Sequence, residues 1–305
     1  MSQKYAAVLL ILLMSVSLVL SACGEAKQVL VPGKVNVVAS FYPLYDFTRK
    51  IGGDHVNAIN LVPAGVEPHD WSPKSKDLRN MNNSDLFVYL GSGFEGWVGD
   101  YLGSLKPGVK VTTVETSQGL KMLQSEGADD HGHNDPHVWL SPVNAKKMGQ
   151  TIKEALVKAD PGHQNDYEAN YSKFAAQLDQ LDARYRQALA PLPRKDIVVS
   201  HDAFAYLCRE YGLKQMPIMG LSPDAEPTSK DMQQINAFIK ENQVKYIFFE
   251  ELVSDKLAMT LAKDAKIETL VLNPLEGLSD EQIKAGQDYI SVMDANLKNL
   301  VKALQ

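Results

Sequence analysis

Short apolar runs alternate with amphipathic stretches along most of the chain. A short apolar run predicts a buried strand, whereas apolar residues spaced three or four apart predict one face of a helix. The first half predicts strands at residues 35–40, 56–62, 86–90 and 110–114, and helices at 45–51 and 143–158. Strands that alternate with helices favour a parallel sheet covered by helices.

The longest amphipathic stretch spans residues 163–190. Its large apolar side chains recur at steps of three and four residues: Tyr167, Tyr171, Phe174, Leu178, Leu181, Tyr185 and Leu189. Pro191 and Pro193 end the stretch, because proline has no amide donor and clashes with the preceding turn. We therefore predict one long helix that connects the two halves of the chain.

After the long helix the alternation starts again. Strands are predicted at 196–200, 246–249 and 269–272, and helices at 203–211, 228–241, 255–263 and 279–304. The last of these is predicted as a single long helix that starts at Ser279 and Asp280. The sequence thus predicts an α/β protein with mostly parallel sheets. Its parts are an N-terminal lobe at 34–160, a linking helix at 161–191 and a C-terminal lobe at 192–305.

The first 22 residues are interpreted as a targeting segment and not as part of the fold. Lys4 gives a positive start, and residues 6–20 are apolar apart from Ser15 and Ser17. Spanning a bilayer takes about 20 apolar residues, so this stretch is too short for a membrane helix. It is typical of a signal peptide, which we assign to residues 1–22.

The signal peptide ends in Leu20-Ser-Ala-Cys23, which resembles the lipobox of bacterial lipoproteins. In such proteins the cysteine is lipidated and becomes the new N-terminus. Cys23 is therefore predicted to anchor the mature chain at the outer face of the cell membrane, with residues 23–33 as a polar tether. The alternative is an ordinary signal peptide with a cysteine near its cleavage site.

The composition is that of an ordinary globular protein, and it narrows the classes of partner. Of the 305 residues, 45% are hydrophobic and 22% are charged, which excludes wholesale disorder and a membrane bundle. The chain has 31 Lys and Arg and 37 Asp and Glu, a net charge of −6, and it lacks the basic run of a nucleic-acid binder. Two cysteines cannot build a disulfide framework, and Cys208 is interpreted as a buried apolar residue.

Three of the seven histidines lie where predicted strands or turns end: His69, His137 and His201. His69 and His137 each follow a proline and precede a tryptophan by two residues. His201 directly follows a predicted strand, and ligands of open α/β sheets bind beyond the carboxyl ends of strands. The three lie far apart in the chain, so only the fold can bring them together. Taken alone, each is more often a structural residue than a metal ligand.

Six short segments follow one another along the mature chain: 39–43 (ASFYP), 66–70 (VEPHD), 135–142 (DPHVWLSP), 200–204 (SHDAF), 220–227 (GLSPDAEP) and 249–251 (FEE). In this order they resemble the zinc-binding lipoproteins of bacterial ABC zinc importers. These are metal-specific solute-binding proteins of family 9, or cluster A-I. The resemblance implies two α/β lobes joined by a rigid backbone helix, with the metal held between the lobes.

The resemblance also implies a set of three imidazoles and one carboxylate. By position, His69, His137 and His201 are the imidazole ligands, and Glu276 in the loop after the last strand is the fourth. The alternative fourth ligand is Glu67 or a water molecule. Glu276 would then only cap the region of the last helix, which starts at Ser279. Such a set holds Zn²⁺ in a tetrahedron.

The same resemblance bears on the choice of metal and on the residues beside the ligands. The manganese branch of the family carries an acid at the position of His201, so an imidazole there favours zinc over manganese. Asp135 and Asp202 flank ligands. They either orient the rings by accepting the second N–H or cap the helices that follow. Trp71 and Trp139 are interpreted as packing residues.

The remaining histidines give weaker signals. Residues Asp129 to His133 (DDHGH) are similar to a shortened form of the His- and acid-rich loop of many zinc members of the family. Such a tract can collect metal weakly, and a plain solvated loop is the alternative. His55 and His163 are interpreted as surface residues.

The resemblance implies an extracytoplasmic, high-affinity zinc receptor that delivers Zn²⁺ to the membrane permease of an ABC importer in a Gram-positive bacterium. No enzyme activity is expected, because four protein ligands leave no position on the metal for a reactive water. The protein is expected to be a monomer. A manganese-binding homologue and a surface adhesin are the alternatives. A secreted zinc hydrolase is less favoured, because the sequence has no His-Glu-x-x-His segment and no evident general base.

Overall fold

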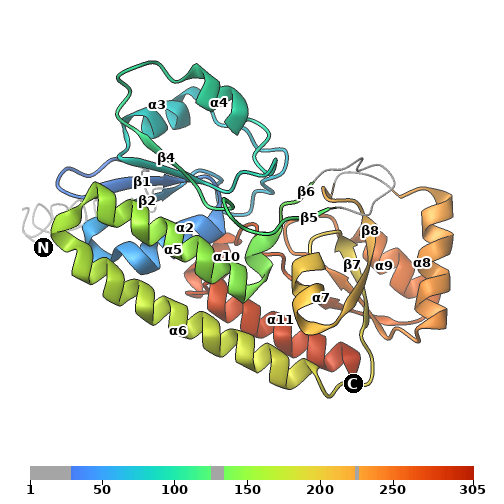
Figure 1. Cartoon of the computed structure of the whole chain (residues 1–305). Coiled ribbons are helices and arrows are strands. Elements are labelled where there is room, and N and C mark those ends of the chain that lie inside the picture. Colours follow the sequence, from blue (N-terminus) through green and yellow to red (C-terminus); the bar gives the residue numbers. More distant parts are fainter. Residues whose placement is uncertain (1–28, 125–133, 224–226) are drawn as a thin grey trace, which may run out of the picture.

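Two parallel sheets, one from each half of the chain, form the scaffold (Figure 1). The computed structural model describes residues 29–124, 134–223 and 227–305. Helices cover the sheets, and the long helix α6 (Gln164–Leu189) extends along both lobes. The predicted architecture of two α/β lobes with a long connecting helix is therefore confirmed.

The N-terminal sheet has the strand order β2-β1-β3-β4, and all its strands are parallel. The strands are β1 (Val35–Ala39), β2 (Val56–Asn60), β3 (Leu86–Tyr89) and β4 (Thr112–Glu115). The accompanying helices are α2 (Tyr42–Gly52), α3 (Ser75–Asn83), α4 (Val98–Ser104) and α5 (Pro142–Ala159), with the short 3-10 turns η1 (Gly53–His55) and η2 (Val138–Leu140). The central strands β1 and β3 are almost entirely buried, which explains their apolar runs.

The C-terminal sheet has the order β10-β9-β7-β8 and is also parallel. Its strands are β7 (Asp196–His201), β8 (Lys214–Met219), β9 (Tyr246–Phe249) and β10 (Glu268–Val271), and its covering helices are α7 (Ala205–Tyr211), α8 (Ser229–Glu241) and α9 (Lys256–Ala265). The sequence pattern did not predict β8, because Pro217 interrupts it. At the edge of a sheet a proline is tolerated, since its missing amide costs no central ladder bond.

A short antiparallel ribbon connects the lobes near their boundary. It pairs β5 (Leu123–Gln124) with β6 (Asn134–Asp135). The hydroxyl of Tyr206, on α7, accepts a hydrogen bond from the Leu123 amide and donates one to the Asp135 carbonyl, both at 2.8 Å. The ribbon is thereby fixed to the C-terminal lobe.

The long helix α6 begins and ends within one residue of the amphipathic stretch at 163–190, and the first residues of the linking segment predicted at 161–191 form the 3-10 turn η3 (Pro161–His163). Its buried residues are Tyr167, Phe174, Ala175, Leu178, Leu181, Tyr185 and Leu189, which include most of the predicted apolar face. It packs against α2, α5 and α11 (Tyr289–Leu304). Through these contacts one buried apolar cluster runs from β1 to the end of α11 without a break.

The predicted single helix at 279–304 is wrong, because the structure has two helices there, α10 (Asp280–Lys284) and α11. The chain turns at Gly286, whose φ of 71° lies in the left-handed region that ends helices. The Asp288 carboxylate then caps α11 by accepting from the Ser291 amide at 2.8 Å. The predicted start is correct, since Ser279 is the N-cap of α10.

Some sequence predictions fall outside the described residues. These are the signal peptide at 1–22, Cys23, the first part of the tether, the segment from Asp129 to His133, and residues 224–226 of one motif. Among the helices of the described ranges, none has both the length and the apolar character that a membrane crossing requires.

Candidate metal centre

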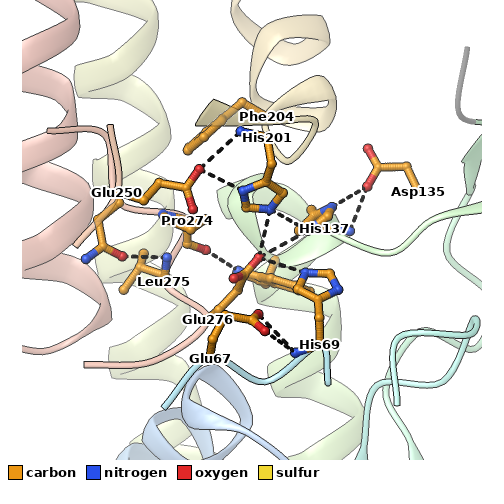
Figure 2. A network of polar contacts seen from close by, with 12 residues as sticks. Glu67, His69, Asp135, His137, His201, Phe204, Glu250, Pro274, Leu275 and Glu276 are labelled. Carbon is orange, nitrogen blue, oxygen red and sulfur yellow. Dashed lines mark hydrogen bonds and ion pairs between the residues drawn. The ribbon is translucent and has the colours of Figure 1, made fainter. Parts of the chain in front are cut away.

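The side chains of His69, His137, His201 and Glu276 meet at one point between the two lobes (Figure 2). Each offers one nitrogen or oxygen atom, and these four atoms all lie within 4.8 Å of one another. The chain therefore brings together the three histidines and the carboxylate that the resemblance implied. A set of imidazole and carboxylate donors at this spacing can hold a metal ion.

Each of the four side chains is placed by the end of a regular element. His69 lies in the loop between β2 and α3, and His137 immediately precedes the turn η2. His201 is the last residue of β7, and Glu276 lies in the loop between β10 and α10. The site thus draws on both lobes and lies beyond the carboxyl ends of strands, where ligands of parallel sheets bind.

The distances within the cluster match the edges of a tetrahedron. Glu276 Oε1 lies 3.3 Å from His69 Nε2, 3.1 Å from His137 Nε2 and 3.2 Å from His201 Nε2. The Nε2 atoms of His137 and His201 are 3.3 Å apart. Donors held at 2.0–2.1 Å from a zinc ion in tetrahedral geometry are about 3.3 Å from one another. Four of the six edges therefore already have the length that a zinc ion would impose.

The cluster is buried on every side except at His69. The His137 and His201 side chains are fully buried, Glu276 is 3% exposed, and His69 is 10% exposed. The ring of Phe94 lies 5.0 Å from the His69 ring, and the Trp139 ring lies 5.2 Å from the His137 ring. Aromatic rings thus pack against two of the ligands, and His69 is the ligand with the largest exposed fraction.

Opposite charges shift the pKa values of the ligands in the metal-free protein. Burial lowers the pKa of His137, but its contacts with Asp135 and Glu276 outweigh burial and raise the pKa to about 8. Burial likewise disfavours protonated His201, yet Glu250 and Glu276 hold its pKa well above its usual range. Burial would raise the pKa of Glu276, but the rings of His201 and His69 keep it well below its usual range. The carboxylates around the cluster thus favour the protonated form of His137 and His201 while no metal is bound.

Asp135 orients His137, as one of the two interpretations from the sequence predicted. Its Oδ1 accepts hydrogen bonds from His137 Nδ1 at 2.8 Å and from the His137 amide at 2.9 Å. These bonds fix the ring so that Nε2 faces the other ligands (Figure 2).

The corresponding role at His201 belongs to Glu250, and the prediction for Asp202 is wrong in both its forms. Glu250 Oε1 accepts from His201 Nδ1 at 2.7 Å (Figure 2). The Asp202 carboxylate accepts from the Gln215 side chain, and α7 starts after Phe204 without a side-chain cap. The sequence held a signal for Glu250: it directly follows strand β9, a neighbour of β7, in one of the six motif segments.

The carboxylate of Glu67, the alternative fourth ligand, accepts hydrogen bonds from the backbone of its own loop. Its two oxygens lie 2.9 and 3.0 Å from the His69 amide, which donates to them (Figure 2). Among the described residues, the cluster of converging donor atoms contains Glu276 and not Glu67. Glu67 therefore shapes the loop that presents His69.

The donor cluster does not include four residues that were predicted to be buried, packing or surface residues: Trp71, Cys208, His55 and His163. The Trp71 ring packs on Trp97 at 5.9 Å, and Cys208 is buried, which raises the pKa of its thiol. The rings of His55 and His163 stack at 3.8 Å, where Asp166 and Asp160 pair with them. Trp139 is buried as predicted, but its indole N–H also donates to the Pro274 carbonyl at 2.7 Å.

Replacing Glu250 by Gln should weaken zinc binding about tenfold to a hundredfold. The amide leaves the size of the side chain unchanged but removes the negative charge that fixes the tautomer and the basicity of His201. Asp202→Asn is the matched control, because Asp202 bonds to Gln215 and should keep the affinity of the unmodified protein. Competition with a chromogenic chelator measures both variants. An Asp202→Asn defect larger than that of Glu250→Gln would contradict this assignment.

The sequence matches a family model described as zinc-uptake complex component A, periplasmic, over residues 37–303. It is 42% identical over 294 residues to the zinc-binding lipoprotein AdcA of Streptococcus pneumoniae, covering 93% of this chain and 58% of that protein. It is also 41% identical over 283 residues to the high-affinity zinc uptake system protein ZnuA of Bacillus subtilis, covering 89% and 88% of the two chains. The chain thus spans only a little more than half the length of AdcA.

The fold agrees with that of a solved relative. The crystal structure of the Zn(II)-bound ZnuA-like domain of Streptococcus pneumoniae AdcA superposes with a TM-score of 0.79 at 41% identity. The match covers 89% of this chain and 99% of that domain. The two-lobed arrangement and the long connecting helix are therefore shared with this domain.

Proposed function

The chain belongs to the family of the zinc-uptake complex component A, and from that premise we propose that it is a high-affinity zinc receptor of an ABC importer. It captures Zn²⁺ outside the cytoplasm and hands the ion to the membrane permease. The observation that carries the proposal is the tetrahedral spacing of three imidazole nitrogens and one carboxylate oxygen. Zinc is the cargo of this protein and not a resident cofactor.

The donor set favours zinc over manganese. Three of the four donors are neutral imidazoles, whereas Mn²⁺ suits sets made mainly of carboxylate and other oxygens. His69, His137, His201 and Glu276 are thus the proposed zinc ligands, with Asp135 and Glu250 behind them.

The same geometry argues against a hydrolase. A catalytic zinc site keeps one position open for water, whereas here a fourth protein donor closes the tetrahedron. Release of the ion then needs a movement of a ligand-bearing segment, which engagement with the permease would supply.

The cellular setting follows from the sequence and from the relatives. A signal peptide at 1–22 and lipidation of Cys23 would tether a monomer to the outer face of the membrane, with lobes at 34–160 and 192–305 joined by 161–191. The name of the AdcA relative includes the word lipoprotein, and both relatives come from Gram-positive bacteria. A Gram-positive source for this chain is proposed on the same grounds.

Metal titration of the chain from residue 24 onward tests the proposal. We expect one tightly bound zinc per chain, and a large excess of manganese should not displace it. In the source bacterium, loss of the gene should slow growth in chelator-treated medium, and added zinc should restore growth while manganese should not. Displacement of zinc by equimolar manganese would favour a manganese receptor. Binding of the metal-free protein to host matrix proteins, without a zinc phenotype, would favour an adhesin.

A further inference from the structure

The loop that presents Glu276 is held in an unfavourable backbone conformation. Leu275, next to the ligand, has a φ of 60° and is fully buried. A bulky residue rarely adopts this left-handed region, because its Cβ crowds the backbone. Such a conformation persists only where the surroundings over-determine it, and it is common at ligand-binding sites.

Asn273 holds this loop from the C-terminal lobe. Its Oδ1 accepts from the Leu275 amide at 2.7 Å, and its own amide and carbonyl pair with the Asn296 side chain at 2.9 and 2.7 Å. Glu251 accepts from Asn273 Nδ2 at 2.8 Å. These bonds fix the start of the loop, but none of them reaches across to the other lobe.

Among the described residues, Trp139 supplies one of two hydrogen bonds that join the backbone of this loop to the N-terminal lobe, the other being that of the Gly65 amide, which donates to the Leu278 carbonyl at 2.9 Å. Its indole N–H donates to the Pro274 carbonyl at 2.7 Å, in a fully buried position. The hydroxyl of Tyr289, at the start of α11, donates to the Trp139 carbonyl, so Trp139 bonds to the C-terminal lobe at two points. Trp139 lies two positions after the ligand His137 and packs on its ring. One side chain thus contacts the segment of one ligand and the loop of another.

We infer that Trp139 is a positioning residue that holds Glu276 in the metal-binding geometry and makes the His137 and Glu276 segments close and open together. The inference rests on the proposed zinc receptor and adds a residue to its machinery. When the indole bond is intact, the strained loop keeps its carboxylate against the three imidazoles. When the lobes shift, the Pro274 carbonyl loses its partner and the loop is free to relax away from the ion, which provides a route for release.

Trp139→Phe tests this, because phenylalanine keeps an aromatic ring but has no N–H donor. In the full mature chain we expect zinc binding about fivefold weaker, the usual effect of one buried hydrogen bond, and the change should appear as faster zinc dissociation. In a Glu276→Ala background the same substitution should change neither the affinity nor the dissociation rate. A residue that acts only on general stability would have the same effect in both backgrounds.

Trp97→Phe is the control, because Trp97 packs on Trp71, Phe87 and Tyr101 away from the cluster and should leave zinc binding unchanged. Equal losses from Trp139→Phe with and without Glu276, or no loss at all, would overturn the inference. If Trp139→Phe does not fold, Tyr289→Phe replaces it in the same cycle, since the Tyr289 hydroxyl holds Trp139 in place.

The same measurements separate this inference from the proposed function. A wild-type chain without tight zinc binding would overturn the function itself. Tight wild-type binding that Glu276→Ala weakens and Trp139→Phe leaves unchanged would overturn only the role of Trp139.

Discussion

Replacing His201 by alanine should weaken zinc binding by roughly a hundredfold to a thousandfold. Structural zinc sites bind their ion with about 10–16 kcal/mol, so one of four ligands accounts for about 2.5–4 kcal/mol. His201 is fully buried, and its ring faces both Glu250 and Glu276. Its removal therefore takes away a zinc donor, leaves the buried Glu250 without its ring partner and leaves Glu276 with two rings instead of three. His69→Ala and His137→Ala should behave alike.

Chelator competition on the purified variants measures this loss. His55→Ala and His163→Ala are matched controls, because these two histidines stack on one another at the surface and should bind zinc as the unmodified chain does. Circular dichroism of each variant reports whether the fold is kept. A folded His201→Ala chain with the affinity of the unmodified protein would exclude this imidazole as a ligand. Glu276→Ala should have a smaller effect, because water can take the place of a carboxylate.

Zinc affinity should fall steeply as the pH drops below about 8, well above the value of about 6.5 expected for ordinary histidines. Zinc binds only the neutral imidazole, so each proton held by the metal-free site must leave first. The pKa of His137 is raised to about 8 and that of His201 lies well above its usual range. The neighbouring carboxylates thus favour the protonated form of both rings in the metal-free protein, and binding must displace these protons. Affinity should then decrease roughly a hundredfold from pH 7.5 to pH 6.5.

Titrations at a series of pH values, in buffers with different heats of ionisation, give both the affinity and the number of protons released. We expect release of about two protons near neutral pH, and about one in His137→Ala. Zinc affinity should rise with pH because Asp135, Glu250 and Glu276 stabilise the protonated rings, which cannot bind zinc. An affinity that stays constant between pH 8.5 and pH 6.5 would contradict this account.

Much of the scaffold could be predicted from the sequence because its signals are local. The period of the apolar residues located α6 almost to the residue, and the buried runs located β1, β3, β7 and β9. The break between α10 and α11 was missed, because the apolar pattern continues through it. The break depends on the left-handed Gly286 and on the Asp288 cap, which a periodicity argument does not weigh.

The site was predicted less evenly. His201 stood out because it directly follows a predicted strand, whereas Glu276 came only from the resemblance, since nothing local marks a loop carboxylate as a ligand. The residue that orients His201 is Glu250 and not the predicted Asp202, and this error has a physical cause. The residue next to a ligand in sequence points elsewhere, and the neighbouring strand β9 delivers its carboxylate to the ring. Such partners depend on strand order, which the sequence alone did not provide.

The unbroken apolar cluster shared by both sheets has a consequence for engineering. Helix α6 packs on elements of both halves, and α11 starts beside the N-terminal lobe and ends beneath β7 and β10. Neither half can therefore be transferred to another protein without losing part of its packing. A chimera that exchanges one lobe with a relative would have to bring along the matching faces of both helices, or it would expose the interior of the half that remains.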